Sequence, residues 1–406
     1  MRKRTTLTAI DVGTTKVCTI IADMDQGGNV VVTGVGLTPS NGLHKGLVVN
    51  INDAREAIRE SVRKAEQASG YKVESAYIGV TGRHVTSLNN RGVVAITRND
   101  RLVRSDDLKR VLQCAQNVKV PADRKLLHVI PRGYAVDGQL GVKNPIGMHG
   151  FRLDVETHII TAAVTSVQNL IKCIRGIGID IDDLVLEPLA SSEAVLTDDE
   201  KDVGVILADI GGGTTDIAVF KDGSIWHTAI LPVAGYQLTR DVSIGLGLPF
   251  DVAEEMKKRY GSVMPVYEGK METPSAMAAD GHGVSYQDLC DIVRARMEEI
   301  VRLILLELPR TEYETLVPAG LVLTGGSSNI SGIEVLGRDI LRLPVRVGAP
   351  NNINGISDIL RDPAHATGVG LLLWGAKHEG KQVKWQGGGL GAGLRHLMSR
   401  FRKLFT

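Results

Sequence analysis

The chain has 406 residues, more than one ordinary hydrophobic core accommodates, so two or more domains are expected. Its formal net charge of +1 excludes a global field that would draw it onto nucleic acid or membrane, so any charged partner must be recognised by a local patch. The aromatic content of 4% also argues against base-stacking surfaces, and we expect no nucleic-acid partner.

Cysteine usage and apolar runs indicate the compartment. The four cysteines are far apart in the sequence: Cys18, Cys114, Cys173 and Cys290. Neither a zinc site nor a disulfide framework is therefore expected, and the protein is expected in a reducing compartment. The N-terminus lacks an apolar stretch for a signal peptide, and no run approaches the ~18 residues of a spanning helix. We expect a soluble, cytosolic protein.

Residues 1–81 are predicted to form the first part of domain I. Residues 53–68 carry an apolar stripe at helical spacing, and Asp53 is the expected N-cap. The predicted strands are residues 7–11, 17–22, 29–37 and 77–80.

Residues 82–164 have a mixed texture that predicts a small α/β subdomain inserted into domain I. One helix is expected to open at Ser105, and strand-like pieces lie at residues 93–97, 126–131 and 157–164.

The remaining sequence divides between two domains and a tail. Domain I is expected to resume at residues 165–202 and to close at 348–377. Domain II is predicted to comprise residues 203–235, a small lobe at 236–310, and residues 311–347. Helices are expected near residues 236–244, 250–259, 286–308 and 330–341, the last after a strand at 321–323. Residues 378–393 are rich in glycine and lack periodicity, which predicts a flexible linker.

One short pattern occurs twice, about 200 residues apart. Residues 9–17 (AIDVGTTKV) are similar to residues 208–217 (ADIGGGTTDI), each with a strand carrying an Asp, then glycine, then paired threonines and a second strand. A repeat at this distance implies two related domains that face each other.

Each copy has the residues that a phosphate-binding hairpin needs. Glycine lets backbone N–H groups approach phosphate oxygens, threonine hydroxyls add donors, and lysine adds positive charge. The candidate phosphate-binding residues are Gly13, Thr14, Thr15, Lys16, Gly211, Gly212, Gly213, Thr214 and Thr215. Asp11 and Asp209 are hard oxygen ligands suited to Mg²⁺, which retains waters and contacts few carboxylates.

The two turns resemble the phosphate motifs of the actin, sugar kinase and heat-shock chaperone superfamily. Residues 323–328 resemble its adenosine motif, and residues 186–190 and 366–370 resemble its two connecting helices. The resemblance covers residues 7–377 and implies a two-domain α/β actin-like ATPase fold with Mg-ATP in the cleft between the domains. It also implies adenosine contacts from Gly235, Glu254, Lys257, Gly325, Gly326 and Ser327.

Glu187 is the candidate for positioning the attacking water. Phosphoryl transfer needs little covalent help, so an in-line water, a metal ion and backbone donors suffice. The expected activity is a slow ATPase with a mainly structural role.

The last thirteen residues predict an amphipathic membrane-binding helix at residues 394–406. Its apolar residues at helical spacing are Leu394, Leu397, Met398, Phe401, Leu404 and Phe405. Its basic residues are Arg395, Arg400, Arg402 and Lys403, with no acidic residue among them. A helix of ~20 Å is too short to span the ~30 Å hydrocarbon core, so it is expected to lie in the interface on anionic lipid. Because one such helix binds weakly, the tail also predicts self-assembly, which multiplies avidity.

Core, insert and tethered tail together resemble the FtsA family of bacterial cell-division proteins. The resemblance implies a peripheral protein on the cytoplasmic face of the inner membrane at the division site, which polymerises and binds the C-terminal peptide of FtsZ on the small lobe. Arg294, Arg296 and Arg302 are the candidate contacts for that acidic peptide. The insert would recruit other division proteins.

Three alternatives remain open. A cytoplasmic actin-like adaptor of a pilus-assembly complex would have little use for the membrane-binding tail. A small-metabolite kinase would need an acidic base beside its acceptor, and no isolated signature for one is visible. A chaperone would need a substrate domain after residue 377, where only 29 residues remain.

Overall fold

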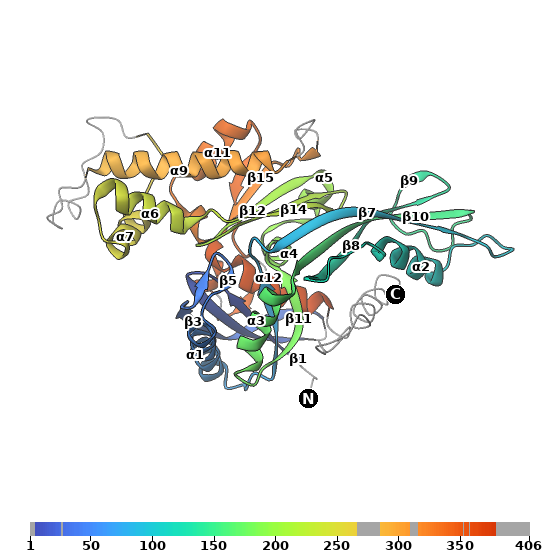
Figure 1. The fold of residues 1–406 in the computed structure, drawn as a ribbon, viewed down its shortest axis with the longest axis horizontal. Coiled ribbons are helices and arrows are strands. Elements are labelled where there is room, and N and C mark those ends of the chain that lie inside the picture. The colour runs from blue at the N-terminus through green and yellow to red at the C-terminus, as the bar shows by residue number, and fades with distance from the viewer. Residues whose placement is uncertain are drawn as a thin grey trace.

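The computed structural model describes residues 5–25, 27–265, 285–308, 316–351, 353–356 and 358–378. Two domains face each other, and a smaller subdomain extends to one side of them (Figure 1). The predicted tail at residues 394–406, with its linker at 378–393, lies outside the described residues apart from His378.

Domain I is built on a six-stranded sheet. Its strands, from one edge to the other, are β11 (Asp180–Leu186), β6 (Ser75–Val80), β1 (Thr5–Val12), β2 (Lys16–Met24), β3 (Val30–Pro39) and β17 (Asn354–Gly355). β1, β2 and β3 form an antiparallel meander, and β6 runs parallel to β1. A two-stranded hairpin, β4 (Leu43–His44) and β5 (Leu47–Val48), follows β3.

Helix α1 (Ile51–Ser69) packs against β2 and β3 and begins two residues earlier than predicted. Its N-cap is Asn50, whose side chain accepts hydrogen bonds from the backbone N–H groups of Asn52 and Asp53. The prediction of Asp53 as the cap is therefore wrong. Asp53 lies inside the first turn, where its carboxylate accepts a hydrogen bond of 2.7 Å from the Asn50 amide.

Domain II repeats this topology. Its five strands, in sheet order, are β14 (Ser224–Leu231), β13 (Thr215–Lys221), β12 (Val205–Ile210), β15 (Leu321–Thr324) and β16 (Val345–Val347). β12, β13 and β14 form an antiparallel meander with β15 parallel to β12, as β1, β2 and β3 do with β6. Asp11 pairs with Cys18 in the first sheet, and Asp209 pairs with Asp216 in the second. The duplicated sequence pattern therefore marks a duplicated structural unit.

In the described part of domain II, three helices form its small lobe, and a fourth contacts the sheet. α6 (Gly235–Leu246), α7 (Phe250–Tyr260) and α9 (Tyr286–Leu306) pack together in the small lobe, while α11 (Ile333–Leu341) contacts α9 and β16 (Figure 1). Apolar side chains from these helices and from β12, β13 and β15 share one core, which is separate from the core of domain I.

Two helices connect the domains. α4 (Glu187–Val195) contacts β6 and β11 of the first sheet and β12 and β13 of the second, and α12 (Ala366–His378) packs along α4. Both begin where the sequence predicted connecting helices. The described part of domain I also contains helices α3 (Val164–Arg175) and α5 (Asp198–Val203).

The inserted subdomain has its own sheet and core. The sheet order is β7 (Val85–Ala95), β10 (Arg152–Ala163), β8 (Arg124–Val136) and β9 (Gln139–Val142), with α2 (Ser105–Gln116) packed against β7 and β10. The strand predicted at residues 93–97 is wrong in its bounds, because only residues 93–95 belong to a strand, the end of the longer β7.

The insert is also hydrogen-bonded to domain II along β14. His158 lies between the side chains of Asn89 (2.7 Å) and Thr228 (2.9 Å), and Ser87 Oγ donates to the Thr228 carbonyl at 3.0 Å. The guanidinium of Arg132 lies 4.0 Å from the centre of the Trp226 ring. The insert is therefore continuous in the chain with domain I, while its strands make noncovalent contacts with domain II.

Candidate nucleotide-binding site

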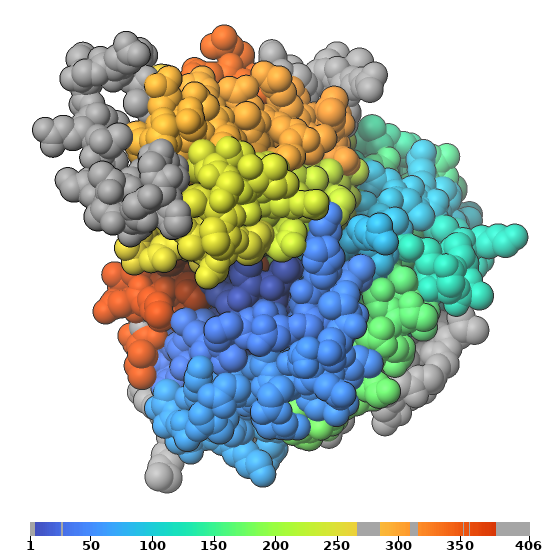
Figure 2. Space-filling model, turned by 60° about the vertical axis from the view of Figure 1, so that its left-hand side comes forward, coloured from blue at the N-terminus to red at the C-terminus, as the bar shows by residue number. Residues whose placement is uncertain are grey.

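The two predicted phosphate turns close β1–β2 and β12–β13 at the junction of the domains. In each turn the first glycine donates a backbone hydrogen bond across it, from Gly13 to Lys16 (3.1 Å) and from Gly211 to Thr214 (2.9 Å). A methyl group added to Gly213 would lie 2.5 Å from Thr14 Oγ1, so the turns face each other in close contact. In Figure 2 the surface is hollowed between the small lobe (yellow) and domain I (blue), with the earliest strands (dark blue) in the hollow.

Four buried carboxylates lie behind these turns: Asp11, Asp209, Asp216 and Glu187. Burial, partly offset by Lys16, raises the pKa of Asp11 to about 6. Burial also raises the pKa of Asp216 to about 7, although hydroxyls of Thr81 and Thr214 donate to it. A cation would stabilise this concentration of negative charge.

The donor set fits a hard divalent ion. The carboxylates are oxygen ligands of the kind that Mg²⁺ prefers, and it commonly uses only one or two of them with waters and phosphates. Among the described residues, no three His, Cys, Asp or Glu side chains converge to hold a metal ion by themselves.

Asp209 is oriented by both connecting helices. Its Oδ2 accepts hydrogen bonds from Ser191 Oγ of α4 (2.6 Å) and from Thr367 Oγ1 of α12 (3.0 Å). Burial raises the pKa of Asp209 in spite of these donors. The sequence interpretation did not include Ser191, Thr367 or Asp216 among the site residues.

Lys16 lies at one end of the first turn. Its ammonium donates to the Ala364 carbonyl at 2.6 Å and lies 3.2 Å from Nδ1 of His365. The 3₁₀ turn Pro363–His365 in turn meets the adenosine motif, because the Gly325 N–H donates to the Pro363 carbonyl at 3.2 Å. Lys16 therefore contacts the same 3₁₀ turn that is hydrogen-bonded to the predicted adenosine residue Gly325.

Those adenosine residues gather around Gly211. The Gly235 N–H (3.1 Å) and Ser327 Oγ (2.9 Å) both donate to the Gly211 carbonyl. Lys257 Nζ pairs with the Glu254 carboxylate at 2.6 Å and lies 3.4 Å from the Gly235 carbonyl. The structure thus brings these four residues together at the base of α6.

Gly325 and Gly326 differ in the space available for a side chain. Gly325 has a φ of 85°, and a Cβ there would lie 2.3 Å from Asp209 Oδ1, whereas a Cβ at Gly326 would meet only the Ala364 methyl, at 3.6 Å. The glycine at position 325 therefore lets the adenosine motif approach the Asp209 carboxylate.

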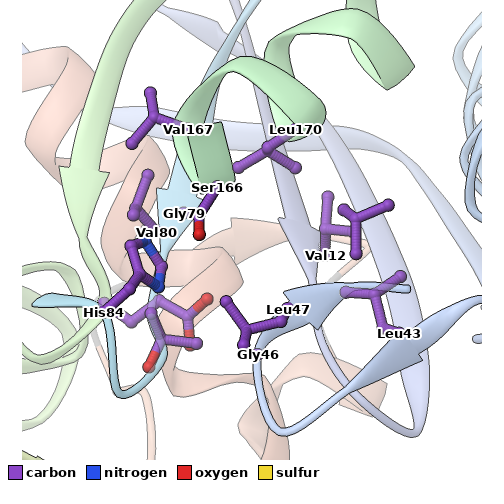
Figure 3. Close-up of a pocket in the computed structure, with 13 residues that line it drawn as sticks. Val12, Leu43, Gly46, Leu47, Gly79, Val80, His84, Ser166, Val167 and Leu170 are labelled. Atoms are coloured by element: carbon purple, nitrogen blue, oxygen red, sulfur yellow. The ribbon is translucent and has the colours of Figure 1, made fainter. Parts of the chain in front are cut away.

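Glu187 is the first residue of α4 and lines a small pocket in domain I (Figure 3). Burial, with Asp11, Asp216 and Asp209 nearby, raises its pKa well above the usual value. Other residues that line this pocket include Val12, Gly46, Thr81, His84 and Ser166. A carboxylate in this environment accepts a proton readily, which suits a residue that positions and deprotonates water.

The three arginines proposed for peptide binding lie along α9 and already pair with acids of the same chain. Arg294 and Arg302 both contact Glu298, at 3.1 and 3.4 Å. Arg296 pairs with Asp241 of α6 at 2.5 Å and also with Glu299. An acidic peptide would have to compete with these intramolecular partners.

No helix in the described part of the chain is long and apolar enough to cross a membrane.

The chain matches two family models. Residues 206–370 match the model described as "Cell division protein FtsA", and residues 82–161 match the "SHS2 domain inserted in FTSA". The second match falls on the sheet formed by β7, β8, β9 and β10.

Relatives of the same description align over nearly the whole length. Cell division protein FtsA of Pseudomonas aeruginosa is 43% identical over 376 residues, covering 92% of this chain and 90% of the relative. The Neisseria meningitidis protein is 41% identical over 402 residues, covering 96% and 97%. The Escherichia coli K12 protein is 33% identical over 416 residues, covering 99% of both.

Solved structures share the fold at low identity. The PilM-PilN type IV pilus biogenesis complex aligns with a TM-score of 0.63 at 16% identity, covering 91% of this chain and 98% of that chain. MreB5 of Spiroplasma citri bound to ADP aligns with a TM-score of 0.51 at 13% identity, covering 93% and 96%. These likenesses confirm the actin-like fold, and the SHS2 match confirms the inserted subdomain. At such low identity the solved structures show the fold alone.

Proposed function

Because the chain belongs to the FtsA family of bacterial cell-division proteins, we propose that it binds Mg-ATP between its two domains, assembles at the cytoplasmic membrane and anchors FtsZ filaments there. The observation that carries the nucleotide part is the pair of glycine-threonine turns in contact, with four buried carboxylates behind them. Such turns offer backbone N–H groups to phosphates, and a phosphate-bound metal ion offsets the carboxylate charge.

Within this site each group has a distinct part. Gly211, Gly212 and Gly213, with Gly13 in the first turn, would cradle the phosphates. Asp11 and Asp209 would hold Mg²⁺, which would offset negative charge on the phosphates. Glu187 accepts a hydrogen bond, and then the proton, from the attacking water. Because Gln has nearly the same shape as Glu but cannot take up a proton, Glu187→Gln should keep ATP affinity within about twofold and lower hydrolysis by about 100-fold. Single-turnover hydrolysis and ATP binding are the measurements, and loss of binding would refute the assigned role.

The membrane part of the proposal is supported by the basic and apolar pattern of residues 394–406. Anchoring by many weak helices requires a polymer, so ATP-dependent assembly and membrane binding should occur together. The family also supports the remaining partners, namely other division proteins at the insert and an FtsZ peptide on the small lobe.

Cosedimentation with phosphatidylglycerol vesicles in the presence of ATP tests the anchor. The full chain should pellet with these vesicles and not with neutral phosphatidylcholine, whereas a chain ending at Lys377 should stay in the supernatant. A full-length variant with Phe401→Ser and Leu404→Ser keeps every tail charge and should also remain unbound. Pelleting of the truncated chain to the same extent would contradict the proposed anchor.

A further inference from the structure

The short hairpin of β4 and β5 crosses from domain I to the phosphate turns. Its tip is Lys45-Gly46, and both residues have positive φ, 49° and 73°. Two such residues make the tight turn whose twist suits a two-residue hairpin. This hairpin was not among the predicted elements.

The tip contacts both phosphate turns and the small lobe. The Gly46 N–H donates to Thr14 Oγ1 at 3.2 Å, and a methyl group added to Gly213 would lie 2.9 Å from the Lys45 Cα. His44 meets the Tyr236 ring edge-on, with the ring centres 5.7 Å apart. The hairpin therefore contacts domain II across the cleft between the domains.

The two ends of the second phosphate turn have different neighbours, and these predict the orientation of a bound nucleotide. Its Gly211 end is bonded to Gly235 and Ser327, where the adenosine residues gather, and its Gly213 end meets Lys45. Glu187 lines the same pocket as Gly46, the neighbour of Lys45 (Figure 3). A nucleotide with its base at the first end has its last phosphate at the second, beside the water-positioning carboxylate.

Lys45 is the candidate source of positive charge at this second end, because its Cα lies beside Gly213. The two lysines predicted for the site lie near the adenosine residues, where Lys16 donates to the Ala364 carbonyl and Lys257 pairs with Glu254. Lys45 is half-buried and makes no hydrogen bond or ion pair to the described part of the chain. The Thr14 hydroxyl accepts from Gly46, which leaves its hydrogen free to donate to a phosphate oxygen.

We propose that Lys45 binds the terminal phosphate of the nucleoside triphosphate and so distinguishes it from the diphosphate. This inference rests on the proposed nucleotide site. The lysine acts as a point charge at the phosphate that is lost on hydrolysis. Because its hairpin contacts domain II across the cleft, the terminal phosphate would help to hold the two domains together.

The test compares ATP and ADP affinity in three variants. Lys45→Gly removes the ammonium and suits the positive φ, and Lys45→Arg keeps the charge at the same backbone position. Lys72→Ala, at an exposed lysine beyond α1, is the matched control. Lys45→Gly should weaken ATP binding by about 10- to 100-fold, the usual loss for a hydrogen bond to a charged group, and change ADP binding less than about twofold. Lys45→Arg should retain most of the ATP affinity, and Lys72→Ala all of it.

Equal loss of ATP and ADP affinity in Lys45→Gly, or no loss of either, would overturn the role of Lys45. If the unaltered chain binds neither nucleotide, the proposed nucleotide site itself fails, and the Lys45 proposal fails with it. The two failures are therefore distinguishable. A melting temperature of Lys45→Gly close to that of the unaltered chain ensures that binding differences do not reflect unfolding.

Discussion

The Ser191 hydroxyl donates a 2.6 Å hydrogen bond to the Asp209 carboxylate, joining connecting helix α4 to the second phosphate turn. Thr367 of α12 donates to the same carboxylate oxygen at 3.0 Å. Both helices that join the domains thus converge on one candidate metal ligand. A shift of either helix would change the orientation of that ligand.

Ser191→Ala should separate this orienting role from packing. Ser192, the next residue of α4, is equally buried, but within the described part of the chain its hydroxyl bonds only to the Leu189 carbonyl of the same helix. Each Ala substitution should lower the free energy of unfolding by about 1 kcal/mol. Only Ser191→Ala should raise the Mg²⁺ concentration needed for ATP binding. Mg²⁺ titrations of nucleotide affinity measure this, and identical Mg²⁺ dependence in the two variants would contradict it.

Gly325→Ala should abolish nucleotide binding, whereas Gly326→Ala should be tolerated. At position 325 the φ of 85° disfavours any side chain, and the new methyl group would lie 2.3 Å from Asp209 Oδ1 and 2.6 Å from the Ile210 carbonyl. We expect a loss on the order of 2–4 kcal/mol in the free energy of unfolding. At position 326 the methyl group finds an ordinary contact of 3.6 Å. Thermal unfolding and ATP binding should be measured for both variants. Similar values for the two would contradict the close approach of position 325 to Asp209.

Asp216→Asn should stabilise the nucleotide-free protein at high pH but not at low pH. The folded-state pKa of about 7 exceeds the ordinary value of 3.8, so between these values the unfolded chain is ionised while the folded protein keeps its proton. Stability therefore falls as pH rises through this window, and the penalty is fully present above pH 7. Without Mg²⁺ or nucleotide, the variant should gain about 1–3 kcal/mol at pH 8 and nothing at pH 4.

Melting curves across that pH range measure the gain. Asp222→Asn, at an exposed turn of the same domain, is the control, because asparagine also tolerates its φ of 54°. A gain for Asp216→Asn of the same size at pH 4 and pH 8 would show that ionisation of the buried carboxyl is not its cause.

Arg302→Glu should weaken binding of an FtsZ C-terminal peptide without lowering stability. The side chain is 66% exposed, and its contact with Glu298 is 3.4 Å long, so the pair contributes little to folding. Loss of an attractive charge and gain of a repulsive one should lower the affinity by about tenfold. Peptide titrations measure this effect.

Arg296→Glu should weaken peptide binding and also reduce stability, because the side chain is 23% exposed and joins α9 to Asp241 of α6. Arg63→Glu is the matched control, since Arg63 pairs with Glu60 on a helix of domain I and is 52% exposed. A tenfold loss of peptide affinity in Arg63→Glu would mean that net charge, and not the α9 surface, governs binding.

The sequence was sufficient for the parts of the site whose residues are neighbours in the chain. The turn at Gly13–Thr15, the turn at 211–214 and the starts of α4 and α12 each follow from a local pattern of glycine, threonine or proline. Asn50 was missed as a cap because Asp53, three residues later, is an equally good capping residue by type. The bounds of α1 shifted accordingly.

Residues that act across long sequence distances could not be predicted in this way. Ser191 and Thr367 meet Asp209 from 18 and 158 positions away, and Arg296 meets Asp241 from 55 positions away. Asp216 had one visible signal, since it occupies the place of Lys16 in the other copy of the repeat. Strands β4 and β5 have two residues each, too short for a period-2 pattern, so the hairpin that presents Lys45 had no detectable signature.

The attachment of the insert at two places has a mechanical consequence. The chain enters and leaves it from domain I, near residues 81–85 and 163–164, while His158 and Ser87 hold it to β14 of domain II. Any rotation of one domain against the other must either break these hydrogen bonds or flex the two short stretches of backbone. A protein that binds the insert would therefore change the preferred angle between the two domains without contacting the nucleotide itself.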